Sequence, residues 1–265
     1  ARETTARVAA AAVCRKLHAE FGITVESYVT EIGGVTADLA SIPIEERGAR
    51  ADESDVRCPH SKASESMRAH ISESMKAKDT LGGVFEVVAL GVPPGLGSHV
   101  HWDRKIEGRL AQALLSIHAI KGAEVGPAFE NARNPGTRVH DEMFLEDGQV
   151  IRKTNRAGGT EGGITTGQPL LLRAAMKPLS TTLNPLQTVD LASGEPAPTT
   201  YERSDFCAVP RAAVVGEAMV AFILADELLR KLGGDSLAEL KPRFISLCTG
   251  KLDDLRMDGQ KRVFW

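Results

Sequence analysis

Apolar and polar residues follow two periodicities along the chain, one typical of helices and one typical of strands. Apolar residues recur every three to four positions in four segments that predict helices: 1–21, 61–78, 103–117 and 211–231. Apolar and polar residues alternate at 23–32, and apolar runs at 84–92 and 170–176 stop at prolines, which predicts strands. This mixture favours an α+β fold in which helices and strands share a core.

The segment 211–231 is apolar on nearly all sides, which is typical of a helix buried on several sides, for example between two sheets. Its apolar stretch is shorter than the roughly 20 residues that span a bilayer, and Glu217 and Asp226 interrupt it. We therefore expect no membrane-spanning helix here. Gly233 and Gly234 end the segment, and residues 235–265 predict a peripheral helix with a charged tail.

Two parts of the chain resemble each other weakly. Leu81–Pro93 and Glu161–Pro178 each run from a double glycine through an extended apolar segment to a proline, and an apolar helix follows each of them. Two copies are too few for a solenoid, so the repeat favours a pseudo-duplicated α+β architecture. Residues 37–59 are polar and irregular, which predicts a surface excursion.

Composition excludes several classes of partner. The 265 residues can form a large core, in one sizeable domain or two ordinary ones. A net charge of −3 and 42% hydrophobic residues describe a soluble globular protein without the global basic excess of a nucleic-acid or membrane binder. The four cysteines are widely spaced without a C-x-x-C motif, which favours reduced thiols in the cytoplasm. Cys58 and His60 lack further ligands nearby, so we expect no metal.

A glycine-rich stretch from Asn155 to Cys207 carries the candidate chemistry. Its backbone amides can approach a ligand closely at glycines 158, 159, 162, 163 and 167. Lys177, Ser180 and Thr181 then supply one positive charge and two hydroxyls, a set suited to holding an anion. The alternative is a glycine-rich turn that leads into an ordinary strand, and composition does not separate the two.

Several common catalytic motifs are absent from the chain. The sequence has no G-x-x-x-x-G-K-[ST], no G-x-G-x-x-G opening a βαβ unit, no G-x-S-x-G and no H-E-x-x-H. These absences argue against a P-loop NTPase, a Rossmann dehydrogenase, a serine hydrolase of the nucleophile-elbow type and a zinc protease. His99 and His101 are expected to have no carboxylate partner close by and are interpreted as loop residues.

The remaining motifs, taken together, resemble the chorismate synthase family. In chain order they are Ala1–Thr4, Gly82-Gly83, Gly91–Gly97, Ser116–Gly122, Asn155–Gly159, Gly162-Gly163 with Gly167, Lys177–Thr181 and Arg203–Cys207. Each motif is short, but their number, order and spacing make the resemblance specific from Ala1 to about Leu229. Two of them depart from the family: its K-P-T-S-S is K-P-L-S-T here, and its R-H-D-P-C is R-S-D-F-C. The pattern is similar to the branch found in actinobacteria and their relatives.

The resemblance implies a lyase of the shikimate pathway, and thus of aromatic amino acid biosynthesis. The family converts 5-enolpyruvylshikimate-3-phosphate to chorismate and phosphate by an anti 1,4-elimination, with reduced FMN as cofactor and no net redox change. The expected fold is a pseudo-symmetric β-α-β sandwich, with helices packed between antiparallel sheets, in a cytoplasmic homotetramer. The sequence leaves open whether NADPH reduces the flavin on this protein or an outside reductant is needed.

The resemblance also implies which residues hold the flavin. His118 and Ala119 are expected to line FMN, and Gly162 to let the backbone approach it. The polar end of the flavin is expected to contact Lys177, Pro178, Leu179, Ser180 and Thr181. The alternative for His118 is a structural role at the end of its predicted helix.

Two further positions match the reacting part of the family's site. Arg203 is expected beside both flavin and substrate, where a guanidinium pairs with carboxylate or phosphate. Asp205 is the expected catalytic residue, a proton acceptor near the flavin N5. The alternative for Asp205 is a surface carboxylate paired with Arg203, since residues two apart on an extended segment share one face.

The family's upstream motifs have no counterpart in this sequence. In the family, the N-terminal third carries G-E-S-H-G, a second catalytic histidine, an arginine cluster for the substrate and an R-S-S flavin contact just before the position of Ala1. We therefore expect residues 1–265 to form a single domain without its N-terminal third, with little turnover alone. Two other hypotheses remain: another flavin- or nucleotide-binding enzyme with the same glycine-rich cradle, and a non-catalytic fragment that associates with a partner chain.

Overall fold

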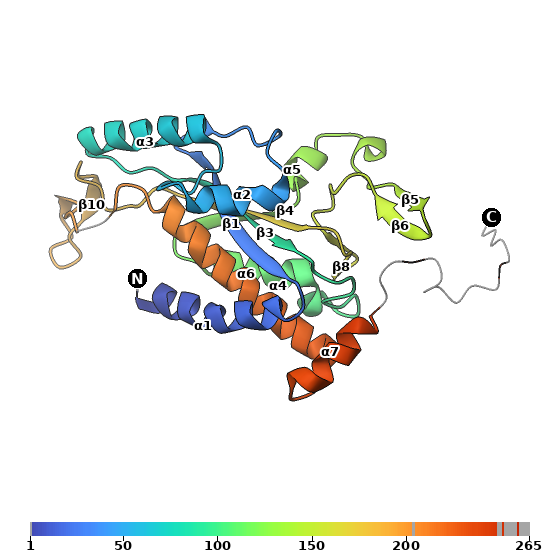
Figure 1. Ribbon diagram of the computed structural model, residues 1–265. Helices are drawn as coiled ribbons and strands as arrows, with labels where there is room; N and C mark the ends of the chain where they lie inside the picture. Colours follow the sequence, from blue (N-terminus) through green and yellow to red (C-terminus); the bar gives the residue numbers. More distant parts are fainter. Residues whose placement is uncertain (1, 203–204, 248–250, 252–258, 260–265) are drawn as a thin grey trace.

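The structure is a computed structural model that describes residues 2–202, 205–247, 251 and 259 (Figure 1). Its centre is a five-stranded antiparallel sheet with the strand order β2-β1-β3-β9-β4. Along the chain these strands are β1 (Thr24–Ile32), β2 (Val35–Thr36), β3 (Gly83–Leu90), β4 (Ile120–Val125) and β9 (Leu170–Met176). The antiparallel sheet and its helices confirm the α+β class predicted from the sequence.

Helices lie on both faces of the sheet. On one face, α6 (Val209–Leu232) crosses β1 and β3 with α1 (Arg2–Ala19) and α4 (Ile106–Leu115) beside it (Figure 1). The other face of β1 is covered by α2 (Ile44–Asp52), and α3 (Ser61–Lys76) contacts β2 at the sheet edge. Strand side chains alternate between the two faces, so Val29 and Val87 join the main core while Tyr28 and Val88 pack under α2.

The central helix α6 is buried along most of its length because it contacts the sheet and the helices α1, α4 and α7. At Gly216 the backbone lies so close to the sheet that a Cβ would come within 2.5 Å of Phe85 Cε2. Pro210 stands in the first turn, where a missing N–H costs nothing, and Gly233 ends the helix at a φ of 61°. The described residues contain one large sheet, so this sheet and helices enclose α6, rather than the two sheets that its apolar sequence suggested.

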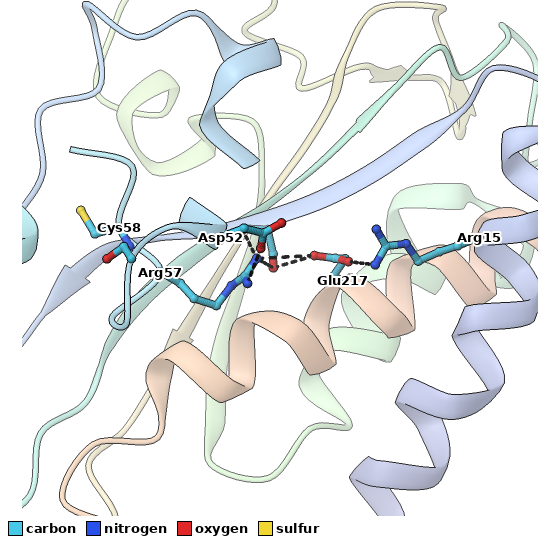
Figure 2. A network of polar contacts seen from close by, with 7 residues as sticks. Arg15, Asp52, Arg57, Cys58 and Glu217 are labelled. Atoms are coloured by element: carbon cyan, nitrogen blue, oxygen red, sulfur yellow. Dashed lines mark hydrogen bonds and ion pairs between the residues drawn. The ribbon is translucent and has the colours of Figure 1, made fainter. Parts of the chain in front are cut away.

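A buried polar network joins α1, β1 and α6 (Figure 2). The Glu217 carboxylate of α6 accepts hydrogen bonds from Arg15 Nη1 at 2.5 Å and from Ser27 Oγ at 2.9 Å. Arg57 lies 3.9 Å from Glu217 Oε2 and donates to Asp52 Oδ1 at 2.6 Å. Burial raises the pKa of Glu217, and the two arginines oppose that rise. A buried carboxylate needs such partners, so the network fixes where α6 sits on β1.

The other described strands form three two-stranded hairpins. These are β5 (Met143–Glu146) with β6 (Gln149–Arg152), β7 (Thr160–Glu161) with β8 (Ile164–Thr165), and β10 (Gln187–Val189) with β11 (Pro196–Pro198). Apolar side chains stay exposed on two of them, with Leu145 58% and Leu191 96% accessible. The short helices α5 (Ala128–Asn131), η1 (Trp102–Arg104) and η2 (Gly136–Arg138) lie in connections, and α7 (Leu237–Ile245) packs against the end of α6.

Two elements differ from the sequence prediction. Helix α2 lies inside the segment expected to be irregular. The sequence did not predict it because only Gly48 and Ala51 of its nine residues are buried, which leaves no clear apolar stripe. Strand β4 replaces the expected end of the preceding helix, because only Ile120 in it is fully buried and Gly122 weakens any strand pattern. None of the described helices is both long and apolar enough to cross a bilayer.

Candidate functional site

Two of the predicted cofactor segments meet at one end of the central sheet. Strand β9 ends at Met176, and β4 begins at Ile120 directly beside it. The backbone N–H of Lys177 donates to the carbonyl oxygen of Ala119 at 2.9 Å. This bond brings the His118-Ala119 turn against the start of the Lys177–Thr181 segment, two stretches that are far apart in the sequence.

The backbone of Ala119 adopts an unusual conformation. Its φ is +65°, in the left-handed region that residues with a side chain rarely occupy. Such backbone strain costs on the order of 1–3 kcal/mol and is found preferentially at functional sites, where surrounding contacts maintain it. The bond from Lys177 to the Ala119 carbonyl is one such contact.

Residues 80–82 support both the lysine segment and the aspartate segment. Thr80 Oγ1 donates to the carbonyl of Leu179 at 2.6 Å, and Leu81 N donates to the carbonyl of Phe206 at 2.8 Å. Gly82 lies against the end of β9, where a Cβ would come within 2.3 Å of the Met176 carbonyl oxygen. The close approach at Gly82 explains why the first double glycine is needed here.

The side chains of this end of the sheet are largely open. Lys177, Pro178 and Ser180 are exposed, whereas Leu179 and Thr181 are half-buried. The His118 side chain is 70% exposed, and its Nε2 lies 3.8 Å from Glu3 Oε2. A ligand therefore has direct access to one ammonium group, one hydroxyl group and one imidazole at the same end of the sheet.

Asp205 sits just before α6 and forms an ion pair with Arg211 in the first turn of that helix. The carboxylate is still 48% exposed on its open side. The sequence suggested Arg203 as the partner of Asp205, but Arg203 lies outside the described residues, as does Ser204. The bridge between Leu81 and Cys207 holds this segment next to residues 80–82.

Helix α1 contributes residues that the sequence analysis did not assign to the site. Arg7 Nη1 donates to Ser116 Oγ at 2.9 Å, and Arg7 Nε donates to Glu3 Oε1 at 3.1 Å. The hydrogen bond and charge of Arg7 lower the pKa of Glu3, which faces His118. The Ala1–Thr4 motif marked Glu3, but nothing in the spacing of α1 marked Arg7.

Gly162, another predicted cofactor residue, lies elsewhere in this chain. It occupies the turn of the β7–β8 hairpin with a φ of +62° and open space around its Cα. Gly163 O accepts the N–H of Ile106, the first residue of α4, and Gly97 bridges Ile164. His118 follows the opposite end of α4, so the structure does not bring Gly162 together with the other predicted residues.

Asp141, which the sequence analysis missed, holds the Asn155–Gly159 motif. Its carboxylate accepts the N–H groups of Arg156 and Ala157, each at 2.8 Å, and the hydroxyl of Thr154. Burial alone would raise the pKa of Asp141, but these three hydrogen bonds outweigh it and lower the pKa.

The amides of this motif are therefore occupied by the protein itself. Gly159 N donates to Asn155 Oδ1 at 2.8 Å, and Asn155 Nδ2 donates to the Pro169 carbonyl at 2.7 Å. Of the two interpretations of the glycine-rich stretch, the turn describes residues 155–159.

Cys58 and His60 have structural roles. The buried Cys58 thiol contacts the carbonyl oxygen of His60 at 3.6 Å, and His60 Nδ1 accepts the N–H of Ala63 at the start of α3. Among the described residues, no group of three or more histidines, cysteines or carboxylates is arranged to hold a metal ion.

The site is an open surface rather than a cavity within one chain. Three cavities of about 600, 590 and 630 Å³ occur elsewhere, at the start of α3, at the end of α6 and beside the β5–β6 hairpin. None of these three is lined by the predicted cofactor residues.

Comparison with known proteins places this arrangement in a family. The sequence profile of chorismate synthase matches residues 1–229. The chorismate synthase of Syntrophotalea carbinolica is 50% identical over 241 residues, which cover 91% of this chain and 62% of that protein. The chorismate synthase of Saccharopolyspora erythraea is 49% identical over 265 residues, which cover 99% of this chain and 65% of that protein.

A solved structure agrees with these sequence matches. A crystal structure of chorismate synthase superposes with a TM-score of 0.79 at 45% identity, covering 92% of this chain and 68% of that one. The chain thus spans a little under two thirds of the length of the curated relatives it matches. On the profile, the sequence identities and the superposition together, the chain belongs to the chorismate synthase family.

Proposed function

We propose that this chain carries the flavin-binding wall of a chorismate synthase that forms chorismate and phosphate from 5-enolpyruvylshikimate-3-phosphate. The observation that carries the proposal is the junction of Ala119 with Lys177, which places a strained turn beside an exposed ammonium group. Membership of the family adds that a reduced flavin is the cofactor, and we propose FMN as that flavin. The substrate is correspondingly a small molecule.

The residues at the junction suit the phosphate at the polar end of a flavin. Lys177 supplies a point charge, and the exposed Ser180 hydroxyl supplies a neutral donor next to it. Ala119 and His118 present a backbone edge and an imidazole to the same surface. When bound, the reduced flavin supplies transient electron donation to the substrate as phosphate leaves.

The surroundings of Asp205 support a role for it as a proton acceptor. Its ion pair with Arg211 holds one side of the carboxylate, and the exposed side remains open to a ligand. Arg211 lies in the first turn of α6, and Glu217 anchors that helix to the sheet. The Asp205–Arg211 pair therefore has a fixed position relative to the sheet. We propose that Asp205 accepts a proton from bound flavin and that Arg203 pairs with an anionic group of the substrate.

A second sheet outside α1 and α6 would complete the sandwich expected for the family. The outer side of these helices exposes apolar residues, including Val13 at 71% and Phe222 at 50%. A shallow cavity of about 250 Å³ between Val8, Ala12 and Val214 lies on the same side. We propose that the part of the family's chain not represented here packs on this surface, and that full turnover requires it.

An anaerobic assay of chorismate formation with reduced FMN tests the proposal. We expect tight flavin binding and turnover when this chain is extended by the preceding region of a relative, and weak flavin binding with little turnover from residues 1–265 alone. Flavin binding without chorismate would instead support another flavin enzyme. Absence of flavin binding in both forms would support a non-catalytic partner module.

Two further properties are tested by the same preparations. Sedimentation of the extended chain with FMN is expected to give a homotetramer. Replacing the chemical reductant, dithionite, with NADPH shows whether the protein reduces its own flavin. Chorismate should form with NADPH only if it does.

A further inference from the structure

A cleft of about 590 Å³ lies at the far end of α6 from the candidate cofactor site. Its walls come from the loop after β3, from α4 and from the last turns of α6. Four cationic side chains line it: Arg104, Arg109, Arg230 and Lys231. The volume falls within the roughly 300–1,000 Å³ typical of small-ligand sites.

Two carboxylates hold two of these cations in position. Asp226 accepts a hydrogen bond from Arg109 Nη2 at 2.6 Å and pairs with Arg230 Nε at 2.9 Å. Glu227, which is buried, forms a second close pair with Arg109. Arg109 and Arg230 are thus pre-positioned, and Arg109 is only 20% exposed.

The other two cations make no such ion pair, although Arg104, after His101, helps to lower the pKa of Asp103 beside it. Among the residues that the structure describes, neither Arg104 nor Lys231 has a carboxylate within ion-pair distance. The remaining carboxylate of the lining, Asp103, instead bonds His101 Nδ1 at 2.6 Å. Positive charge therefore exceeds negative charge in the cleft.

Arg230 and Lys231 lie in the last turn of α6, but neither donates a hydrogen bond to a terminal carbonyl of that helix among the described residues. Positive side chains often balance the last carbonyl groups of a helix, and this is the simplest alternative. Here Arg243 Nη1 takes that position and donates to the Leu232 carbonyl at 2.9 Å. Lys231 Nζ lies over the glycine turn after β3, 3.3 Å from where a Cβ on Gly95 would stand.

We propose that this cleft binds a small polyvalent anion, bearing a phosphate or more than one carboxylate, through Arg104 and Lys231. Arg109 and Arg230, which Asp226 and Glu227 balance, form a fixed wall of the cleft and leave its excess positive charge on Arg104 and Lys231. The Ser98 hydroxyl, which accepts Val100 N at 3.2 Å, has its proton free to donate to the anion. The cleft lining shares no residue with the Lys177 surface, so the two sites are independent of each other.

Inorganic phosphate and pyrophosphate, titrated by calorimetry at constant ionic strength, test this site. We expect saturable binding of one anion to the cleft, tighter for pyrophosphate than for phosphate. Lys231→Gln and Arg104→Gln should each weaken it by about tenfold, because each removes a hydrogen bond to a charged group. The double variant should show no saturable binding at the cleft.

Matched variants separate the cleft from general electrostatics and from the cofactor site. Lys76→Gln changes an exposed lysine of α3 by the same charge, and Lys177→Gln changes the candidate cofactor site. Both should leave binding at the cleft intact. The proposal would be overturned if Lys76→Gln weakened anion binding as much as the cleft variants do, or if only Lys177→Gln weakened it. It would also be overturned if the parent protein showed no saturable binding.

A local reporter gives a second readout. The chain has two tryptophans, and Trp102 is 75% exposed immediately before Asp103 and Arg104 of the lining. In a Trp265→Phe background, Trp102 emission should change with the same half-saturation as the calorimetric signal. An emission that stays constant while phosphate binds would place the anion elsewhere and refute the assignment.

Discussion

The middle of α6 and its N-terminal end differ in how far their side chains are buried. In the middle, Gly216 lies against Phe85, and Glu217 is buried among Arg15, Ser27 and Arg57. At the N-terminal end, Asp205 and its partner Arg211 are 48% and 74% exposed. One helix therefore has a part whose sheet-facing side is closely packed and an end that is open to a ligand.

The contrast shows how the fold separates stability from binding. Close packing and satisfied polar groups fix α6 on the sheet, and that rigidity carries the exposed residues at its end to a defined position. Substitutions in the middle should therefore change the free energy of unfolding, while those at the open end should change ligand affinity. The four predictions below test that separation.

The largest effect is expected for Gly216→Val. The new side chain would enter the space of the Phe85 ring and come near Leu114, and overpacking of this kind costs about 3 kcal/mol of unfolding free energy. Urea denaturation followed by circular dichroism measures it. Gly108→Ala in α4 is the matched control: its Cβ would make only an ordinary contact, 3.8 Å from the Trp102 carbonyl oxygen, so it should stabilise by roughly 0.5–1 kcal/mol. Equal effects of the two variants would contradict the packing argument.

Lys177→Ala should give the next largest effect, on binding alone. Loss of the ammonium group should weaken FMN affinity about tenfold or more, because a hydrogen bond to a charged group contributes about 1.5–3 kcal/mol. The lysine side chain is exposed, so unfolding should change by less than about 0.5 kcal/mol. Flavin fluorescence quenching and urea denaturation measure the two quantities. A loss of stability that matches the loss of affinity would remove the distinction between the regions.

Glu217→Gln tests the buried network and its pH dependence. Burial raises the folded pKa of Glu217 above its unfolded value, so the folded state binds the proton more tightly than the unfolded state. Ionisation of Glu217 therefore lowers the free energy of unfolding of the parent protein as pH rises from the unfolded pKa to the folded pKa of this group. We expect the variant to be less stable by about 1 kcal/mol near pH 4, with a smaller difference at pH 7. A difference that grows with pH would mean that the arginine pairs outweigh burial.

The smallest effect is expected for His18→Leu in α1. His18 is 1% exposed, and neither ring nitrogen has a hydrogen-bond partner among the described residues. Burial, together with the charge of Arg15, lowers its pKa to about 4. The unfolded state thus binds the proton first, and stability is lost as pH falls from about 6.5 toward 4.

An apolar residue in place of His18 should stabilise the protein by about 0.5–1 kcal/mol at pH 7, since it removes unsatisfied polar atoms. It should also flatten the stability profile between pH 6.5 and 4. Thermal unfolding at several pH values measures both. Unchanged acid sensitivity would show that other groups dominate acid unfolding.

Much of the fold was predictable because the main elements carry strong periodic patterns. The strands β1, β3 and β9 and the helices α1, α3, α4 and α6 all lie where apolar spacing predicted them, within a few residues at each end. Helix α2 and strand β4 were missed because few of their residues are buried, so tertiary contacts rather than apolar pattern determine them.

The sequence nominated candidate site residues one by one but not the surface that some of them form. Motif resemblance selected Ala119, Lys177 and Asp205, yet the bond between Ala119 and Lys177 depends on the order β9-β4 in the sheet. Arg211 and Arg7 could not be found, because neither belongs to a recognisable motif. Gly162 shows the opposite case, since its motif is clear but its position in one chain is remote from the others.

The packing of α1 against α6 has a consequence for synthesis of the protein. Their contact joins residues 2–19 to residues 209–232, so α1 is synthesised well before the helix that covers it. At about 5–20 residues per second, the apolar side of α1 stays uncovered for roughly 10–40 seconds. Strand β9 likewise completes the sheet late, between β3 and β4. Newly made chains should therefore depend on chaperones during that interval, and slower translation should lower the yield of folded protein.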